Sequence, residues 1–206
     1  MKKAGVLLAG GGLDSTALMI WLAKQKKDIE VMHVDYGQKA WYAERLAVEY
    51  FAGKYGFLVK HVACDLTQVG SAAILRDQPM ATEHTENKLE GRNTILIGLA
   101  LTYAASRGMD TVYVGFHKEP EDAPFPDATE KFLEKMYMVA QYGYNPPMAV
   151  LAPFWNKTRL EVFQTGKYLD DEFVRRSFTC YEGRINECGQ CTHCLTKKEM
   201  VAACAE

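Results

Sequence analysis

The chain has 206 residues, of which 48% are hydrophobic and 24% are charged, and its formal net charge at pH 7 is −2. A chain of this length can bury a full hydrophobic core. Its slightly acidic balance argues against direct nucleic-acid binding, which favours basic surfaces. No run of 18 apolar residues is present, so we expect no membrane-spanning helix. Glycines and an aspartate interrupt the apolar stretch near the N-terminus, which favours a buried strand over a signal peptide and hence a cytoplasmic protein.

Patterns typical of strands and helices alternate along the chain. Apolar and β-branched runs predict strands at 4–9, 30–34, 57–62, 111–114 and 148–151. Helical spacing predicts helices at 14–25, 41–54, 93–107, 129–142 and 157–166, with Gly166 as the stop of the last one. Residues 64–90 and 118–127 lack periodicity and are expected to be loops. The predicted fold class is α/β: a doubly wound, mostly parallel, Rossmann-like sheet that binds ligands beyond the carboxyl ends of its strands.

A glycine-rich turn directly follows the first predicted strand. It reads Gly10-Gly11-Gly12-Leu13-Asp14-Ser15-Thr16. Glycines allow several backbone amides to converge on an anion. The helix that follows adds its free N–H groups and the positive end of its dipole. The turn therefore predicts a phosphate-binding site.

Three phosphate-binding loops, and a plain glycine turn without a ligand, are alternatives for this segment. A Walker A loop requires a lysine that is absent here. A dinucleotide-binding loop fits Gly10 and Gly12 but has Ser15 in place of its third glycine, and Asp35 supports it as a weaker alternative. The segment from Gly11 to Ser15 resembles the Ser-Gly-Gly-x-Asp-Ser loop of the PP-loop ATP pyrophosphatases, with Gly10 where that family has serine. We favour this last interpretation.

Four cysteines lie close together near the C-terminus, with the spacing Cys180-x7-Cys188-x2-Cys191-x2-Cys194. Two residues between ligands is a spacing typical of zinc sites, and four thiolates complete a tetrahedral structural site that leaves no position for water. An iron–sulfur cluster is the alternative occupant. His193 lies between the last two cysteines and is expected to be a neighbour of the metal, since four thiolates suffice.

Motifs along nearly the whole chain resemble the 7-cyano-7-deazaguanine synthases, a branch of the PP-loop family. They are Leu8 to Ser15, Asp35-Tyr36-Gly37-Gln38, Gly91-Arg92-Asn93, Phe125-Pro126-Asp127, Lys157 after Pro153-Phe154, and Ser177-Phe178-Thr179-Cys180-Tyr181, which leads into the remaining cysteines. The resemblance implies an ATP-dependent carbon–nitrogen ligase of queuosine-type base synthesis that acts as a homodimer. The implied reaction converts 7-carboxy-7-deazaguanine and ammonia to 7-cyano-7-deazaguanine through an activated carboxylate and an amide. Residues 1–170 are then expected to form the ATP-binding PP-loop domain, and residues 171–206 a zinc-binding segment packed on it.

The resemblance also implies roles for individual residues. ATP, accompanied by Mg²⁺, is expected to contact Leu8, Ala9, Gly10, Gly11, Gly12, Leu13, Asp14, Ser15, Thr16 and Gln38. The implied catalytic residues are Asp14, Ser15 and Lys157. The implied substrate-binding residues are Arg92, Asn93, Asp127, Phe178 and Tyr181. Structural roles remain as alternatives: a surface lysine, an arginine bonded to a loop carboxylate, helix caps, and core packing of the two aromatic rings.

The chain departs from the family pattern at three places. Gly10 replaces the loop serine, Ala128-Thr129 replaces Cys-Arg, and Ser177-Phe178-Thr179 replaces Thr-Trp-Ser. The lost arginine and tryptophan are both expected on the substrate side. The alternative function is therefore a related ligase that stops at the amide or uses another carboxylate. Two other classes are weaker: a tRNA-modifying thiolase, which needs Cys64 as its sulfur carrier, and a non-enzymatic zinc-ribbon module, which leaves the glycine turn unexplained.

Overall fold

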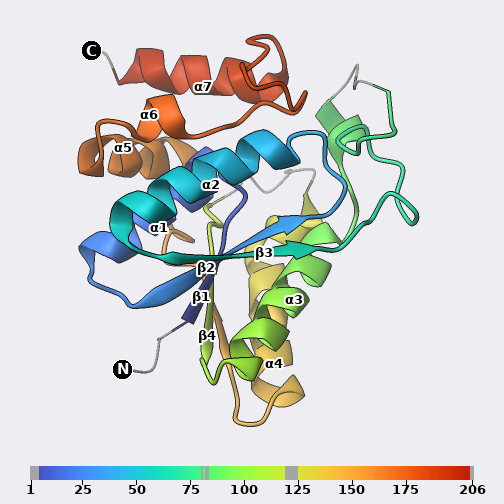
Figure 1. Ribbon diagram of the computed structural model, residues 1–206, viewed down its shortest axis with the longest axis vertical. Coiled ribbons are helices and arrows are strands. Elements are labelled where there is room, and N and C mark those ends of the chain that lie inside the picture. The colour runs from blue at the N-terminus through green and yellow to red at the C-terminus, as the bar shows by residue number, and fades with distance from the viewer. Residues whose placement is uncertain (1–4, 80, 82–83, 119–124, 205–206) are drawn as a thin grey trace.

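The computed structural model describes residues 5–79, 81, 84–118 and 125–204, and a parallel sheet organises them (Figure 1). Its five strands are paired in the order β3-β2-β1-β4-β5, and every pair is parallel. The strands are β1 (Gly5–Leu8), β2 (Ile29–Asp35), β3 (Leu58–Ala63), β4 (Thr111–Val114) and β5 (Ala149–Leu151). The ends of each strand lie within one residue of their predicted positions, and the predicted α/β class is confirmed.

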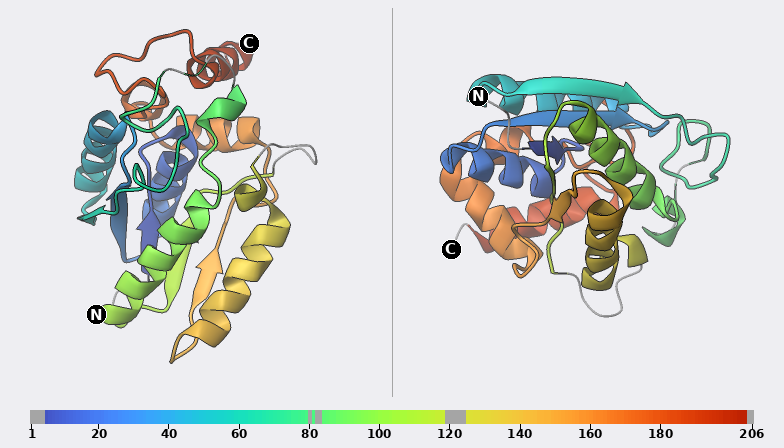
Figure 2. Two further views of the ribbon diagram at one scale, coloured as in Figure 1. Left: turned by 90° about the vertical axis from the view of Figure 1, so that its right-hand side faces the viewer. Right: turned by 90° about the horizontal axis from the view of Figure 1, so that it is seen from below.

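Helices cover both faces of this sheet (Figure 2). On one face lie α1 (Leu13–Lys24), α2 (Trp41–Tyr55) and α5 (Arg159–Leu169), and on the other α3 (Arg92–Ser106) and α4 (Glu130–Gly143). Successive side chains of a strand point to opposite faces, so Val6 of β1 packs with the α3–α4 layer and Leu7 with the α1–α2–α5 layer. In the described part of the chain, no helix is both long and apolar enough to span a membrane.

Four shorter or later elements were not expected from the sequence. They are the 3-10 helices η1 (His84–Asn87) and η2 (Pro126–Ala128), and the helices α6 (Phe173–Arg176) and α7 (Thr192–Ala203). The first two lie in stretches that were predicted to be loops. The last two build the C-terminal segment, which lies beside α5 and α2 at the top of Figure 1.

α5 begins two residues later than predicted. The Thr158 hydroxyl accepts the Glu161 N–H at 3.3 Å, and the Glu161 carboxylate accepts the Thr158 N–H at 2.7 Å. This reciprocal capping box satisfies backbone groups that the first helical turn would otherwise leave open. The helix therefore starts at Arg159 and not at Lys157.

The predicted stop of α5 at Gly166 is wrong, because the helix continues to Leu169. A β-carbon at Gly166 would lie 2.6–2.7 Å from ring atoms of Phe173. That separation is far below van der Waals contact. The glycine therefore allows α6 to pack closely on α5, and it does not end the helix.

The glycine-rich turn lies at the centre of the sheet, where the strand order reverses between β1 and β4. Such a reversal leaves a crevice beyond the carboxyl ends of the strands. A β-carbon at Gly115, which follows β4, would lie 2.9 Å from the backbone nitrogen of Ser15. The C-terminal segment reaches the same point, since the Phe178 N–H donates to the Gly11 carbonyl at 2.9 Å. Three segments that are distant in sequence thus meet at the turn.

Candidate active site

Two adjoining cavities of about 280 and 290 Å³ form a cleft beyond the strand ends. We call them the turn-side cavity, which borders the glycine turn, and the η2-side cavity, which borders η2 and the start of α5. Both are lined by Asp14, Arg92, Asn93, Gly115, Phe116, Tyr181 and His193. The turn-side cavity adds Leu8, Ala9, Gly10, Gly12, Ser15, Tyr36 and Gln38 among others, and the η2-side cavity adds His117, Phe125, Asp127, Ala128 and Arg159. The cleft therefore has two chambers with a shared wall.

The glycine turn presents uncapped backbone to the first chamber. Gly12 is the N-cap of α1, and among the described residues this helix start has no side-chain cap hydrogen bond. Gly11 has φ +71°, and a β-carbon there would lie 2.5 Å from the Glu44 carbonyl oxygen. Gly10 is exposed, and a β-carbon there would meet nothing within 4 Å. An anion fits such a helix start because its N–H groups and dipole face outward.

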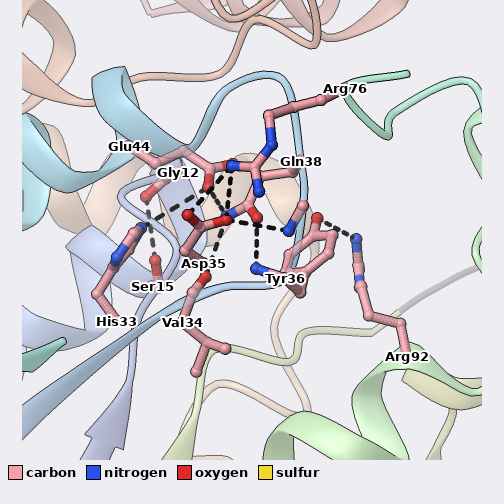
Figure 3. Close-up of polar contacts among 11 residues, drawn as sticks. Gly12, Ser15, His33, Val34, Asp35, Tyr36, Gln38, Glu44, Arg76 and Arg92 are labelled. Atoms are coloured by element: carbon pink, nitrogen blue, oxygen red, sulfur yellow. Dashed lines mark hydrogen bonds and ion pairs between the residues drawn. The ribbon is translucent and has the colours of Figure 1, made fainter. Parts of the chain in front are cut away.

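A hydrogen-bonded loop after β2 supports the turn-side cavity (Figure 3). The buried Gln38 amide donates to the Val34 carbonyl at 3.0 Å and to the Glu44 carboxylate at 2.8 Å, and it accepts the Tyr36 N–H at 2.8 Å. Gln38 lines the cavity as predicted, yet both polar atoms of its side chain bond to the protein. It therefore shapes the wall of the cavity.

Asp35 at the end of β2 is also engaged by the protein. Its carboxylate accepts two hydrogen bonds from Arg76 Nη1, at 2.9 and 3.1 Å, and one from the Gly37 N–H at 3.0 Å. Figure 3 shows the Arg76 side chain reaching down past Gln38 to the Asp35 carboxylate. A dinucleotide-binding site would use the Asp35 carboxylate to bind a ribose. In this structure the carboxylate instead bonds to Arg76 and Gly37.

Two arginines bring positive charge to the cleft. Arg92 donates to the Tyr36 hydroxyl at 3.2 Å, and its guanidinium carbon lies 5.5 Å from the centroid of that ring. Burial raises the pKa of Tyr36, which keeps the phenol neutral. The Nε atoms of Arg92 and Arg159 are buried, and neither has a hydrogen-bond partner among the described residues. An anionic ligand would satisfy them.

Asn93 and Asp127 meet where α3 begins. The Asp127 carboxylate accepts the Asn93 N–H at 3.0 Å, and the Asn93 side-chain amide donates to the Asp127 carbonyl at 2.9 Å. Asp127 thus caps α3 from the loop before α4, while Thr129 caps α4 itself by accepting the Phe132 N–H. The two residues fix the edge of the η2-side cavity and also line it.

Tyr181 and His193 form the wall shared by the two cavities. The Tyr181 hydroxyl lies 2.6 Å from His193 Nε2. Burial raises the pKa of Tyr181 far above its usual value, although Arg92 opposes the shift. On another side of the cleft, His117 Nε2 lies 3.7 Å from the Asp14 carboxylate. His193 carries no sequence signal for this place, because its position between two cysteines points only to the metal.

The cleft omits five residues that were predicted for it. Lys157 lies in the loop before α5, where its N–H and carbonyl bond to backbone groups, and Arg159 lines the cleft instead. Phe178 packs with Ala43, Ala47, Cys180 and Cys194 in a separate hydrophobic cluster. Gly11, Leu13 and Thr16 are buried behind the turn and line neither cavity in the described structure.

The four cysteines gather as the spacing predicted. All four Sγ atoms lie within 4.8 Å of one another, close to the roughly 3.8 Å that a tetrahedral zinc with 2.3 Å Zn–S bonds imposes. The Cys188 N–H donates to Cys180 Sγ, and the Cys191 N–H donates to Cys188 Sγ, each at 3.3 Å. Burial raises the pKa of Cys180 to about 11, so a cation is needed to hold it as a thiolate. The geometry and the donor set fit a tetrahedral metal.

Comparison with known proteins identifies the family. The model of the family described as "Queuosine biosynthesis protein QueC" matches residues 4–204. The chain belongs to this family. Proteins named 7-cyano-7-deazaguanine synthase are similar over most of their length: that of Pyrococcus furiosus is 27% identical over 96% of this chain and 91% of its own. That of Hahella chejuensis is 28% identical over 97% and 88%, and that of Methanocaldococcus jannaschii 27% over 96% and 93%.

The predicted resemblance is therefore confirmed. Among solved structures, the NH3-dependent NAD synthetase of Campylobacter jejuni covers 87% of this chain and 70% of its own, with a TM-score of 0.46 and 17% identity. That likeness is too distant to bear on the function of this QueC family member.

Gly11→Ala and Gly10→Ser test the geometry of the turn. Gly11→Ala is expected to lower the free energy of unfolding by about 1–3 kcal/mol, because the methyl group clashes with a backbone carbonyl at a positive φ. Gly10→Ser should change it by less than about 0.5 kcal/mol, because the side chain enters open space. Urea denaturation of both variants is the measurement, and equal midpoints would contradict the packing described.

Proposed function

We propose that the chain converts 7-carboxy-7-deazaguanine and ammonia to 7-cyano-7-deazaguanine at the expense of ATP; its relatives are named as synthases of that product, and its family is described as one of queuosine biosynthesis. The observation that carries the proposal is the cleft with two chambers. One chamber borders an uncapped helix start, and the other holds the buried Nε of Arg159, which has no hydrogen-bond partner in the described part of the chain. ATP and an anionic acid can therefore lie next to each other with their reacting groups at the shared wall.

The turn-side cavity is the proposed ATP site. The amides of Gly10 and Gly12 and the dipole of α1 face the phosphates, with Mg²⁺ accompanying the nucleotide. Asp14 and Ser15 lie at the pyrophosphate end, and Asp14 also borders the second cavity. The absence of a serine at position 10 leaves room for the phosphate and removes no backbone donor.

The η2-side cavity is the proposed site of the acid. Arg159 and Arg92 bind the carboxylate and the α-phosphate that it attacks. Tyr181 supplies a flat surface for the heterocycle, and Asp127 lies on the opposite edge to accept hydrogen bonds from its amino group. Arg159 provides a cation on this side of the cleft, although position 129 lacks the arginine of the family pattern.

The proposed reaction needs two activations. A carboxylate oxygen attacks the α-phosphorus of ATP and pyrophosphate leaves. Ammonia then adds to the acyl carbon and loses a proton, and AMP departs with that oxygen to leave the amide. The amide oxygen is activated in the same way by a second ATP, and loss of two N–H protons together with AMP gives the nitrile. The arginines and the turn stabilise the charge that develops on phosphate oxygens in each step.

The remaining parts of the proposal concern organisation. Residues 1–170 form the ATP-binding domain, and the four cysteines of residues 171–206 hold a structural zinc whose closed shell leaves no open position. The Sγ separations and the N–H donors to sulfur support zinc. Resemblance to the family supports a cytoplasmic homodimer.

The function is tested by mass spectrometry of the products formed from the acid, ammonium, ATP and Mg²⁺. Nitrile with AMP and pyrophosphate is the expected result. Accumulation of the amide would show a ligase that stops after the first activation. No consumption of the acid by a folded, zinc-containing protein would overturn the proposal and favour another carboxylate.

Arg159→Ala and Lys157→Ala test which of two cationic side chains acts on the acid: Lys157, just before α5, or Arg159, the first residue of that helix. Arg159→Ala is expected to lower kcat/KM for the acid about 10- to 100-fold, because it removes a charge-assisted contact made in the cleft. Lys157→Ala should leave it within about twofold, since its side chain does not line the cleft. Steady-state kinetics with saturating ATP is the measurement, and the opposite ranking would return the catalytic role to Lys157.

Cys191→Ser and Cys204→Ser test the metal. Cys191→Ser is expected to lose zinc and to lower the unfolding temperature, because removal of one ligand opens the tetrahedral shell. Cys204→Ser should keep stoichiometric zinc, since that cysteine lies outside the cluster. Metal analysis and thermal unfolding measure the effect, and a stable, fully active Cys191→Ser protein without zinc would disprove the structural role.

A further inference from the structure

Tyr181 and His193 form a paired wall between the two chambers. Their ring centroids lie 4.1 Å apart with an interplanar angle of 34°, in addition to the 2.6 Å contact between Oη and Nε2. Both side chains line both cavities. A ligand in either cavity can therefore contact this pair of rings.

The cysteine cluster holds this pair at both ends. Tyr181 directly follows Cys180, and His193 lies between Cys191 and Cys194 at the start of α7. The sulfurs of these cysteines gather within 4.8 Å. A metal bound there fixes the backbone beside each ring, so that the relative position of the two rings follows from the metal shell.

Polar groups that a flat acid can use line the same two cavities as the ring pair. They are the Arg92 guanidinium and the Asn93 amide. Arg92 is held by the Tyr36 hydroxyl at 3.2 Å, and Asn93 by Asp127. A pair of rings together with one fixed guanidinium and one fixed amide favours a planar ligand with an anionic group.

We propose that His193 is a positioning residue: through Tyr181 it fixes the wall against which the planar acid lies, and it links that wall to the metal-binding segment. The inference rests on the proposed function. Its ligand class is a flat heteroaromatic carboxylate, and its effect falls on binding of the acid more than on binding of ATP, whose phosphates lie at the glycine turn.

The decisive variant is His193→Phe, which keeps a flat ring against Tyr181 and removes the hydrogen bond. We expect the Kd for the acid, measured by calorimetry, and the KM for the acid to rise about three- to tenfold, with the KM for ATP within twofold and zinc content unchanged. Tyr181→Phe should give the same pattern. The double variant should be no worse than either single one, because both remove the same bond. Thr192→Ala, an exposed neighbour on the same segment, is the matched control and should behave as wild type.

Several results would overturn the inference. They are an unchanged Kd for the acid in zinc-loaded His193→Phe, equal rises for acid and ATP, effects of the two single variants that multiply in the double variant, or loss of zinc from His193→Phe. A wild-type protein that does not bind the acid would overturn the proposed function as well. Wild-type binding with a normal His193→Phe would remove only the positioning role.

Discussion

The cleft depends on how closely the chain approaches itself at the glycine turn. The Glu44 carbonyl occupies the space behind Gly11, and Gly115 lies against the backbone of Ser15. From the third side, the Phe178 N–H bonds to the Gly11 carbonyl. Backbone atoms therefore occupy the space that a side chain at Gly11 or Gly115 would need. These two glycines are needed for this packing.

Several polar residues in the motifs of this family form hydrogen bonds that hold the walls of the cleft together. Gln38 uses its amide to fold the loop after β2, Asp35 holds Arg76, and Asp127 caps a helix to which it does not belong. A buried or half-buried polar group is stable when such bonds satisfy it. The two arginine Nε atoms are the exceptions among the described cleft residues, and they carry the positive charge that an anion would meet.

The sequence predicts the sheet, the five main helices, the glycine turn and the cysteine cluster, because periodicity and ligand spacing are local properties. It fails where a long-range contact decides. The stop at Gly166 was wrong because the ring of Phe173, from the next helix, needs the missing β-carbon. Arg159 carries no motif in the sequence, and only the packing of the start of α5 against the cleft brings it there, whereas the catalytic role of Lys157 stays a prediction. Phe178 packs in a hydrophobic cluster with Ala43, Ala47 and two of the cysteines, and no rule of sequence spacing predicts this position.

The hydrogen bond between Phe178 and Gly11 joins one of the first segments that a ribosome makes to one of the last. The turn after β1 is translated early, yet the partner that supports it from behind emerges only after α5 and α6. All five strands therefore precede the segment that completes the packing behind the turn. The segment that supports the turn from behind also leads directly into the cysteine cluster at Cys180, so the last part of the chain to be made completes both features.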